Sequence, residues 1–541
     1  MVEHDTDRHV DVLVVGGGVG GVAAALAAAR GGARVLLTEE TDWIGGQLTS
    51  QGVPPDENPW IEQFGCTATY RRFRDGVREH YRTWYPLRAE AARSSRLNPG
   101  AGRVGKLCHE PRVALAVLEA MIGPVRASGM LDVALQTRPV AAHADADRVE
   151  AVTLLDERTG NRYTVSAAYV LDATETGDVL ALADVEHVVG AESRAEHDEP
   201  HAPEQADPLN QQGITVCFAV SHHAGEDHVI ERPENYDFWR GYTPEHWGGP
   251  LLSMTAPDPR TLARVTRTFA PNPTADPLAE LADQSKDPGD KDLWRFRRIL
   301  ARGMHTSGAF DSDIVLVNWP MNDYWLKPLA GVDDTARAAA VNGARELSRS
   351  LMYWLQTELP NPDGTQGLPG LRLRPDVMGT HDGLAKAPYV RESRRIRALT
   401  TVTEHDVALD ITGPTGSTRY PNSVGIGSYR IDLHPSTGGD PYIDIASVPF
   451  EIPLGALLPQ RVDNLLPAGK NLGTTHITNG CYRLHPVEWN VGEVAGHLAA
   501  FALRTGRTPK EVESSAPAFE AFAAVLDAAG VERRWPEVRG Y

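Results

Sequence analysis

A G-x-G-x-x-G pattern at residues 16–21 constrains the fold of this chain most strongly, because it lies between an apolar run and a helical segment. Val10–Val15 is apolar apart from Asp11, Val22–Arg30 favours a helix, and Arg34–Leu37 is apolar again after its arginine. This order is typical of a strand–helix–strand unit whose parallel strands are buried. The N-terminal segment therefore predicts an α/β fold.

Three glycines and one acidic residue of this unit predict a dinucleotide site. Gly16 permits a tight turn, Gly18 lets the backbone approach a diphosphate, and Gly21 lets the helix pack closely on the strand. The helix N-terminus adds unpaired N–H groups and about half a positive charge. Glu39 ends the second strand, where a carboxylate can accept hydrogen bonds from ribose hydroxyls. NAD and FAD both bind such a unit, so the choice between them needs other segments.

Composition and charge narrow the class of partner. The chain has 541 residues, which is long enough for two packed domains. Its net charge of -19 repels nucleic acid and anionic membranes, so we expect a small-molecule substrate. The start, Met1–Asp5, lacks the features of a secretory signal, and no apolar run reaches the ~18 residues of a membrane span. Four scattered cysteines without a C-x-x-C pair favour the cytoplasm, and a homo-oligomer is compatible with the sequence.

The rest of the chain reads as further strands and helices separated by polar segments. Acidic and proline-rich stretches, Glu192 to about Pro208 and about Gly225 to Asp290, predict excursions over the surface. Apolar runs predict a meander of three strands at Val133–Leu135, Val149–Leu155 and Tyr163–Leu171. Helices are predicted at Asp333–Leu359, Pro486–Arg504 and Ala516–Ala529. A strand is predicted at Asn464–Leu466, and strand-like patches occur between Arg372 and Ile452.

Four later segments carry a resemblance to a known family. They are Trp43–Thr49, Leu171–Asp178, Leu466–Asn471, and Arg483–Pro486 running into Gly492-x-x-x-Gly496. Together with the N-terminal motif, they resemble the FAD-dependent oxidoreductases with a glutathione-reductase-like FAD domain, and the resemblance covers most of the chain. It implies that FAD is the cofactor and that it contacts Gly16, Gly18, Val19, Gly20, Gly21, Glu39, Glu40, Gly45, Gly46, Gln47, Val140, Ala173, Thr174, Gly469, Asn471, Arg483 and Val487.

The resemblance also implies an α/β architecture in which a Rossmann-type FAD-binding domain carries an inserted mixed α+β substrate domain. We predict the first part of the FAD-binding domain at residues 1–190 and the substrate or cap domain at residues 191–445. The return segment is predicted at residues 446–505 and a C-terminal helical tail at residues 506–541. The closing helix is expected to begin at Pro486 and to direct the free N–H groups of Val487, Glu488 and Trp489 at the N1/C2 edge of the flavin.

Candidate catalytic residues come from polar clusters at Tyr389–Arg395, Tyr429–His434 and His476–His485. His434 is either a proton acceptor beside the flavin N5 or a histidine in a turn. His485 is either catalytic or a cap of the closing helix, and His476 is a further candidate from the same cluster. Arg391 either binds a substrate carboxylate or belongs to an ion-pair cluster, which is the favoured interpretation.

Two histidines and two cysteines could indicate a metal site or a covalently bound flavin, but each pair has a simpler explanation. His222 and His223 have no carboxylate or cysteine partner at ligand spacing, so we expect no metal site. Cys66 and Cys108 lie near segments that resemble the family and could attach a flavin, but small buried cysteines are the favoured interpretation. FAD is therefore expected to bind without a covalent bond.

The leading functional prediction is an FAD-dependent dehydrogenase or oxidase that transfers a hydride from a polar small organic substrate to FAD. No second glycine motif follows an apolar strand, and Gly425-Ile426-Gly427 fails the pattern, so a dedicated NAD(P)H domain is not expected. One alternative is a flavin-dependent monooxygenase that uses NAD(P)H. The other is a non-catalytic flavin-binding module that serves an interaction partner.

Overall fold

The structure is a computed structural model that describes residues 8–282, 291–413 and 416–540. Residues 1–7 lie outside the described part, and the expectation about the start of the chain, Met1–Asp5, falls on them. The same is true of residues 283–290, which include the end of the excursion expected at Gly225–Asp290.

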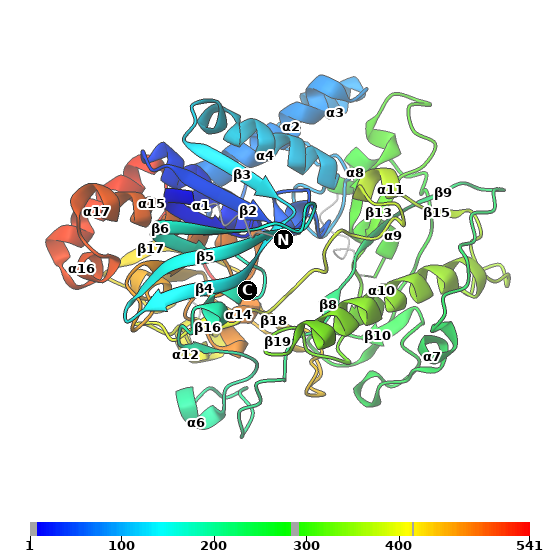
Figure 1. The fold of residues 1–541 in the computed structure, drawn as a ribbon. Coiled ribbons are helices and arrows are strands. Elements are labelled where there is room, and N and C mark those ends of the chain that lie inside the picture. The colour runs from blue at the N-terminus through cyan, green and yellow to red at the C-terminus, as the bar shows by residue number, and fades with distance from the viewer. Residues whose placement is uncertain (1–7, 283–290, 414–415, 541) are drawn as a thin grey trace.

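A seven-stranded sheet forms the centre of the larger region of the molecule (Figure 1). Its main path has the order β3-β2-β1-β6-β5-β4, and β21 pairs with β6. Strands β3, β2, β1, β6 and β21 run parallel, whereas β4, β5 and β6 form an antiparallel meander. The strands are β1 (Arg8–Val15), β2 (Val35–Glu39), β3 (Leu131–Leu135), β4 (Thr137–Asp145), β5 (Arg148–Asp156), β6 (Arg162–Asp172) and β21 (Leu465–Pro467).

Strand β6 pairs with two different strands along the edge that faces away from β1. Its first half, Arg162–Ser166, pairs with β5, and its last three residues, Val170–Asp172, pair with β21. A segment from near the C-terminus therefore lies in the same sheet as the N-terminal strand, with only β6 between them.

Helices α1 (Val19–Arg30) and α15 (His485–Thr505) pack against each other on one face of this sheet. A Cβ atom at Gly492 would overlap the backbone oxygen of Gly20, and one at Gly496 would overlap that of Ala24. The two glycines of α15 therefore allow a close approach to α1 that larger residues would prevent. Helix α15 begins at His485, one residue before the expected start at Pro486.

The expected meander needs a correction. Val133–Leu135 was predicted as its first strand, but this run belongs to β3, which pairs in parallel with β2 at the edge of the sheet. The missing meander strand is β4, which the sequence analysis did not predict. Strand β4 contains Pro139 and alternates between partly buried and exposed residues, so it lacks the continuous apolar run of a buried strand.

The second region contains a four-stranded sheet of order β12-β13-β9-β15 and the long helix α10 (Figure 1). Its bounds are β9 (Phe218–His222), β12 (Arg298–Leu300), β13 (Ile314–Val317), β15 (Leu371–Leu373) and α10 (Asp334–Thr357). The segment expected as a surface excursion contributes Trp239 and Trp247 to the core of this region, so that prediction was wrong for these side chains. The proline and aspartate content of the segment indicates a surface loop, but its large aromatic side chains supply enough apolar area to join the core.

The remaining helices and strands connect and cover these two sheets. In the sequence, the connection from β2 to β3 contains helices α2 (Ala68–Trp84), α3 (Ala89–Arg93) and α4 (Pro111–Ala127). The later elements are α5 (Asp178–Leu182), β7 (His187–Val188), α6 (Arg194–His197), β8 (Ile214–Thr215), α7 (Tyr236–Gly241), β10 (Thr255–Pro257), β11 (Arg264–Thr266), α8 (Pro277–Ala282), α9 (Leu293–Phe296), β14 (Asp323–Tyr324), α11 (Pro375–Met378), β16 (Arg395–Ile396), α12 (Glu404–Val407), α13 (Leu409–Thr412), β17 (Ser423–Gly427), β18 (Ile431–Leu433), β19 (Ile443–Ile445), β20 (Phe450–Pro453), α14 (His476–Tyr482), α16 (Pro509–Ser514) and α17 (Ala516–Ala529).

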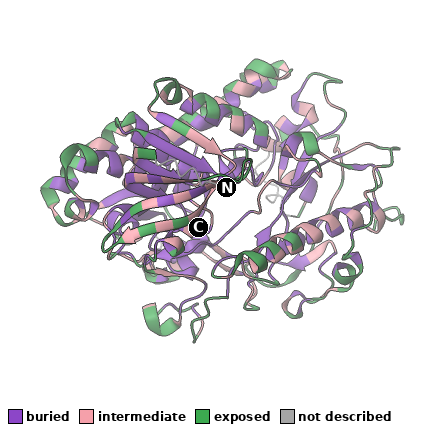
Figure 2. Ribbon diagram, in the orientation of Figure 1, coloured by how far each residue is buried: buried purple, intermediate pink, exposed green. Residues whose placement is uncertain are grey.

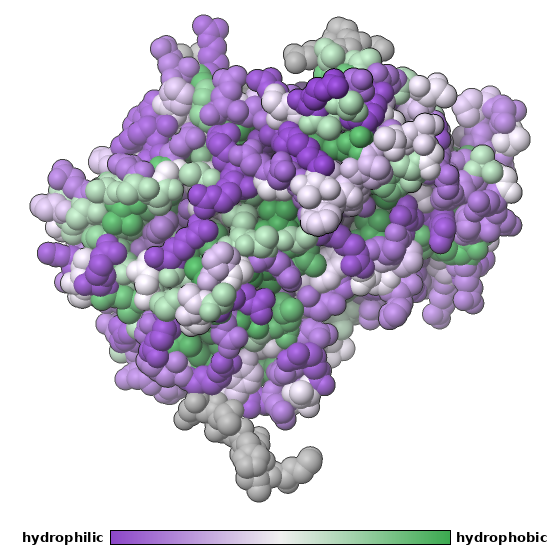
Figure 3. Space-filling model, turned by 90° about the horizontal axis from the view of Figure 1, so that it is seen from above, coloured by the Kyte–Doolittle hydropathy of each residue, from purple (hydrophilic) through white to green (hydrophobic). Residues whose placement is uncertain are grey.

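Buried residues concentrate in the main sheet and in the helices packed on it, while the outer helices are largely exposed (Figure 2). Hydrophilic side chains form much of the face seen in Figure 3, with apolar patches between them. The acidic stretch at Glu192–Pro208 is not wholly at the surface, because Glu192 and Glu199 are buried. Within the described part of the chain, no helix is both long enough and apolar enough to span a bilayer.

Candidate functional site

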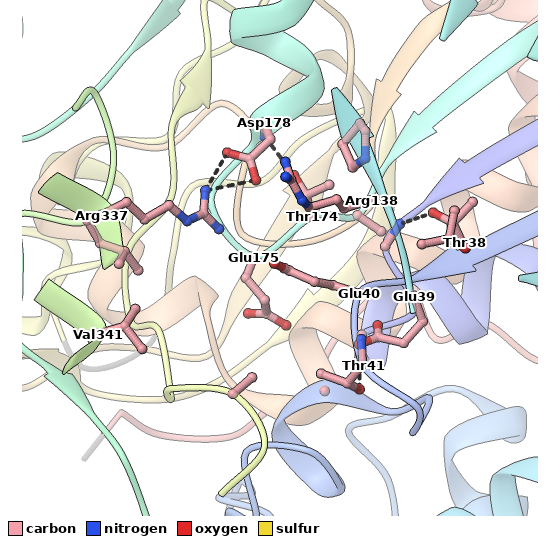
Figure 4. Close-up of a pocket in the computed structure, with 18 of the residues that line it drawn as sticks. Thr38, Glu39, Glu40, Thr41, Arg138, Thr174, Glu175, Asp178, Arg337 and Val341 are labelled. Atoms are coloured by element: carbon pink, nitrogen blue, oxygen red, sulfur yellow. Dashed lines mark hydrogen bonds and ion pairs between the residues drawn. The ribbon is translucent and has the colours of Figure 1, made fainter. Parts of the chain in front are cut away.

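A cavity of about 690 Å³ opens at the carboxyl ends of β1, β2 and β6 (Figure 4). Parallel strands place their carboxyl ends at one edge of a sheet, which is where α/β folds bind ligands. Of the residues expected to contact FAD, those that line this cavity are Gly16, Gly18, Glu39, Glu40, Gly46, Val140, Ala173 and Thr174. Helix α10 from the second region forms part of the opposite wall, including Arg337 and Val341.

The glycine turn before α1 has the geometry that a diphosphate needs. Gly16 has a φ of 102°, and a Cβ atom there would overlap the backbone of Ala173. A Cβ at Gly21 would overlap the oxygen of Gly16, so this glycine allows the close packing of helix and turn. Gly18 is the N-cap of α1, and its lack of a side chain leaves the first N–H groups of the helix without a capping oxygen.

Glu39 orders the glycine turn as well as lining the cavity. Its Oε2 atom accepts a hydrogen bond from the Gly17 N–H at 2.9 Å. Its Oε1 atom accepts bonds from the N–H and the hydroxyl of Thr41, at 2.9 and 2.8 Å. Burial raises the pKa of Glu39 to about 7. The neighbouring Glu40 lines the cavity but is exposed.

The remaining predicted FAD contacts lie around the cavity without lining it. Val19, Gly20 and Gly21 form the first turn of α1, and Gly45 directly precedes Gly46. A Cβ at Gly20 would overlap the oxygen of Ala468, the residue after β21. Asn471 donates a hydrogen bond from Nδ2 to the Asp172 oxygen at 2.9 Å. Gly469 lies beside the Glu488 side chain, with 3.4 Å between Oε1 and the position of a Cβ.

Buried polar atoms near the cavity fit a flavin cofactor. Gln47 donates from Nε2 to the Arg483 oxygen at 3.0 Å and to the Glu488 carboxylate. The other amide atom of Gln47, Oε1, and the Oδ1 atom of Asn471 are buried without a hydrogen-bond partner in the described structure. Buried acceptors without partners are costly. Hydroxyl and N–H groups of FAD would supply the missing donors, so the residues present fit this cofactor.

The N-terminus of α15 differs from the expectation. The N–H groups of Val487 and Glu488 both donate to the Leu484 oxygen, at 3.0 and 2.9 Å. Two of the three N–H groups expected to be free for the flavin are therefore already paired, because the helix starts one residue earlier than predicted. His485 does not cap the helix through its side chain; its Nδ1 atom accepts a bond from the Asp56 N–H at 3.2 Å. Burial lowers the pKa of His485 to about 3, so its ring is neutral.

The three polar segments selected in the sequence meet in one buried network. The Nδ1 atom of His434 lies 2.6 Å from Asp323 Oδ2, and the guanidinium of Arg391 lies 2.9 Å from Asp323 Oδ1. The Nε2 atom of His434 lies 3.6 Å from Asp432 Oδ2, and Asp432 is paired in turn with Arg483 at 3.1 Å. Burial opposes ionisation of Asp432, but its contacts with His434 and Arg483 hold its pKa well below the usual range.

Arg483 connects this network to the cofactor cavity. Its guanidinium donates to the Tyr389 hydroxyl at 2.7 Å. Its backbone oxygen accepts from Gln47, the residue after the cavity-lining Gly46. The ring of Tyr389 lies under the guanidinium of Arg391, 4.8 Å from its centre. The polar network and the cavity are therefore neighbours.

His476 belongs to an adjoining cluster. Its Nδ1 atom lies 2.9 Å from Glu392 Oε1, and Arg395 pairs with the same carboxylate at 2.7 Å. Burial works against both charges, but the pair raises the pKa of His476 and lowers that of Glu392 to about 2. Gln212 links the two clusters, because its N–H donates to Glu392 at 3.2 Å and its Oε1 accepts from the His434 N–H at 3.3 Å.

Several residues of the site were not predicted from the sequence. Asp323 stands in a short strand without a motif, so only the folded chain reveals its contact with His434. Lys470 and Glu175 lie inside two of the quoted family-like segments, between or beside residues that were predicted. The signal that could have been used is a lone charged residue shortly after each of two parallel strands, since the carboxyl ends of such strands lie at one edge of the sheet.

The cysteines near these segments are inaccessible to solvent. Cys66 and Cys108 are both buried, and burial raises the pKa of each thiol to about 12. Such thiols stay protonated and are poor nucleophiles. In the described residues, no group of three or more His, Cys, Asp or Glu side chains is arranged to hold a metal ion.

Similarity to solved structures is weak in overall superposition. A geranylgeranyl bacteriochlorophyll reductase-like protein from Thermoplasma acidophilum is 10% identical, with 98% of this chain and 85% of that one covered and a TM-score of 0.29. L-proline dehydrogenase from P. horikoshii is 16% identical over 35% of this chain and 25% of that one, with a TM-score of 0.19. The flavin-dependent monooxygenase PieE, solved with FAD and substrate, is 17% identical over 40% and 35%, with a TM-score of 0.24.

Across the first structures that it matches, this chain covers only 25% to 31% of their length. The match to a sequence family is far more extensive. The family model described as FAD dependent oxidoreductase aligns with residues 11–526. Because that alignment spans nearly the whole chain, including both glycine turns that line the cavity, the chain belongs to the FAD dependent oxidoreductase family, and its cofactor is FAD.

Proposed function

We propose that this protein is a dehydrogenase or oxidase that oxidises a small polar organic substrate beside the His434–Asp323 pair, with non-covalently bound FAD as the hydride acceptor. The observation that supports the proposal is the network of hydrogen bonds and ion pairs that runs from Gln47, next to the cavity-lining Gly46, through Arg483 and Asp432 to His434. FAD supplies the electron acceptor for such a reaction, and the protein supplies orientation and a proton path.

His434 is the proposed proton acceptor. The Asp323 carboxylate accepts a hydrogen bond from the Nδ1 side of the ring at 2.6 Å, which orients the imidazole and favours the tautomer with a lone pair on Nε2. Removal of a substrate O–H or N–H proton by Nε2 would accompany hydride loss from the adjacent carbon. Asp432, 3.6 Å from Nε2, would stabilise the positive charge that the ring then carries.

Arg391 is proposed as a positioning residue. Its guanidinium already donates to the Gly213 oxygen at 2.7 Å, to the Thr215 hydroxyl at 3.0 Å and to Asp323 at 2.9 Å. These contacts hold Asp323 ionised and leave little of the guanidinium for a substrate carboxylate. His476 and His485 are proposed to support the site from its rim, since His476 is paired with Glu392 and His485 is neutral.

The decisive experiment is an anaerobic absorbance titration of the purified full-length protein. Alcohols, amines and hydroxy acids are added without NAD(P)H, and bleaching of the flavin band identifies a donor. The proposal is supported by a substrate that bleaches the flavin of wild type and of the surface control His143→Gln at similar rates, but reduces the flavin of His434→Gln far more slowly. Oxygen uptake that requires both NADPH and a substrate indicates the monooxygenase alternative. A flavin bleached by dithionite and by no organic compound indicates a binding module.

A further inference from the structure

A carboxylate lies in the concave space between the two glycine turns. The Oε1 atom of Glu175 is 2.9 Å from the position that a Cβ would take on Gly18, and equally 2.9 Å from that on Gly46. Gly18 precedes α1, and Gly46 begins the short helical turn η1 (Gly46–Leu48). Both glycines and Glu175 line the cavity, and Figure 4 shows the Glu175 side chain projecting into it.

The same space is the one that suits the diphosphate of FAD. Glycine turns let phosphate oxygens approach the backbone, and the N-terminus of α1 favours negative charge there. A carboxylate and a diphosphate are both anions that use the same donors. They cannot share the space at close range without a large electrostatic penalty.

Lys470 is the cation that holds Glu175 in place. Its ammonium group pairs with the Glu175 carboxylate and lies 3.6 Å from Glu488 Oε2. The Lys470 side chain is only 2% exposed, whereas that of Glu175 is 23% exposed. A buried ammonium needs a bound anion, because its desolvation is otherwise uncompensated. Asn479 fixes the backbone of Lys470 by donating to its oxygen at 3.1 Å.

We propose that Lys470 is the counter-cation of the FAD diphosphate, and that Glu175 is an internal anion that the diphosphate displaces from Lys470. Binding is then an exchange of ion-pair partners on a fixed, buried lysine. The more exposed glutamate is the group that moves. Glu488 stays in place, since Gln47 and the first turn of α15 hold it.

Because Glu175 competes with the diphosphate for Lys470, it lowers the affinity of the protein for FAD. This competition involves the cofactor site alone and does not depend on the substrate. It predicts that removing the charge of Glu175 tightens the binding of every ligand with a diphosphate, whereas removing the charge of Lys470 weakens it. A ligand without a diphosphate is insensitive to both changes.

The test uses the full-length protein, freed of flavin by dialysis, and three probes: FAD, ADP and riboflavin. ADP carries the diphosphate without a flavin, and riboflavin carries the flavin ring without a diphosphate. For Glu175→Gln we expect ADP and FAD to bind about tenfold more tightly than in wild type, which corresponds to one charge–charge contact of moderate strength. For Lys470→Gln we expect a loss of about tenfold or more for ADP and FAD. Riboflavin affinity stays within about twofold of wild type in both variants.

Glu204→Gln is the matched control, because Glu204 forms an exposed ion pair with Arg194 and neither residue lines the cavity. It removes the same charge and should leave all three affinities unchanged. Unaltered or weaker ADP binding by Glu175→Gln overturns the proposal, since the carboxylate would then not compete with the diphosphate. If Lys470→Gln does not fold, as judged by its thermal transition, the comparison of Glu175→Gln with Glu204→Gln still decides the question. Equilibrium binding of ADP involves no turnover, so its outcome is independent of the proposed reaction.

Discussion

The Nδ1 atom of His434 lies 2.6 Å from the Oδ2 atom of Asp323, a residue 111 positions earlier in the chain. The same carboxylate is paired with Arg391 through its other oxygen, so one buried aspartate holds two of the residues selected from the sequence. His434 thereby gains a fixed orientation in the network that Arg483 links to Gln47.

His434→Gln should slow reduction of the flavin by substrate about 10²–10⁴-fold, the range of general base catalysis, with little effect on FAD binding. A second change, Asp323→Asn, should lower the free energy of unfolding by about 3–5 kcal/mol, because Arg391 loses its buried charged partner. Rapid-mixing absorbance under anaerobic conditions gives the reduction rate, and denaturant titration gives the free energy of unfolding. A His434→Gln variant that reduces at the wild-type rate would remove this residue from the chemistry.

FAD should leave the protein on acid or heat denaturation, and the released flavin should be FAD rather than FMN. The glycine turns suit a diphosphate that FMN lacks, and the buried cysteines Cys66 and Cys108 are protonated thiols. Chromatography of the supernatant after precipitation identifies the flavin. Colour retained by the precipitated chain would show a covalent bond.

Gly18→Val should abolish FAD binding, and Glu39→Ala should weaken it by about tenfold or more. A valine at Gly18 fills the space between the glycine turns, where only 2.9 Å separates a Cβ from Glu175. Alanine at Glu39 removes bonds to Gly17 and Thr41, each worth about 1.5–3 kcal/mol when one partner is charged. Fluorescence titration of the flavin-free variants measures both affinities, and wild-type affinity in both would exclude this site.

Gly492→Ala should lower the free energy of unfolding by about 1–3 kcal/mol, because its methyl group overlaps the Gly20 oxygen where α15 crosses α1. Gly123→Ala is the matched control. Gly123 also lies inside a helix, α4, but a Cβ there meets no described atom within 4 Å. This control should be neutral or stabilising by up to about 1 kcal/mol. Equal destabilisation by the two changes would contradict the close helix crossing.

Acid should destabilise the wild-type protein partly through Glu392, whose pKa is lowered to about 2 from the ordinary value of 4.5. The unfolded state binds more protons than the folded state between these values, so the free energy of unfolding falls as the pH drops from about 4.5 towards 2. Glu392→Gln should lower stability at neutral pH and remove up to about 3 kcal/mol of this acid dependence. Unfolding measured from pH 5 to pH 3 tests the slope, with Glu204→Gln as the surface control; an unchanged slope would contradict it.

Long and regular elements could be predicted from the sequence, because their signals are local. The predicted strand at Val10–Val15 lies within β1, and the predicted tail helix at Ala516–Ala529 coincides with α17. Strand β4 escaped prediction because exposed residues alternate with partly buried ones in its second half and because one of its residues is Pro139. Its apolar pattern is too weak to distinguish a strand from a loop.

The site could be predicted only where its parts carry local motifs. The glycine turns are such motifs, and residues such as Gly18 and Ala173 do line the cavity. The partners of the candidate side chains could not be predicted, since Asp323 reaches His434 only through the pairing of distant segments. The N–H groups of α15 were misjudged for a smaller reason: a shift of one residue at the helix start decides which of them are paired.

The pairing of β21 with β6 and the crossing of α15 over α1 have a consequence for synthesis of the protein. A ribosome releases the N-terminal glycine turn early, long before residues 465–496 have left the exit tunnel. Until then the last three residues of β6 and the face of α1 that meets α15 have no partner, and Lys470 is not yet beside Glu175. We therefore expect FAD to be held fully only after residues 465–496 have left the ribosome and packed on these earlier segments.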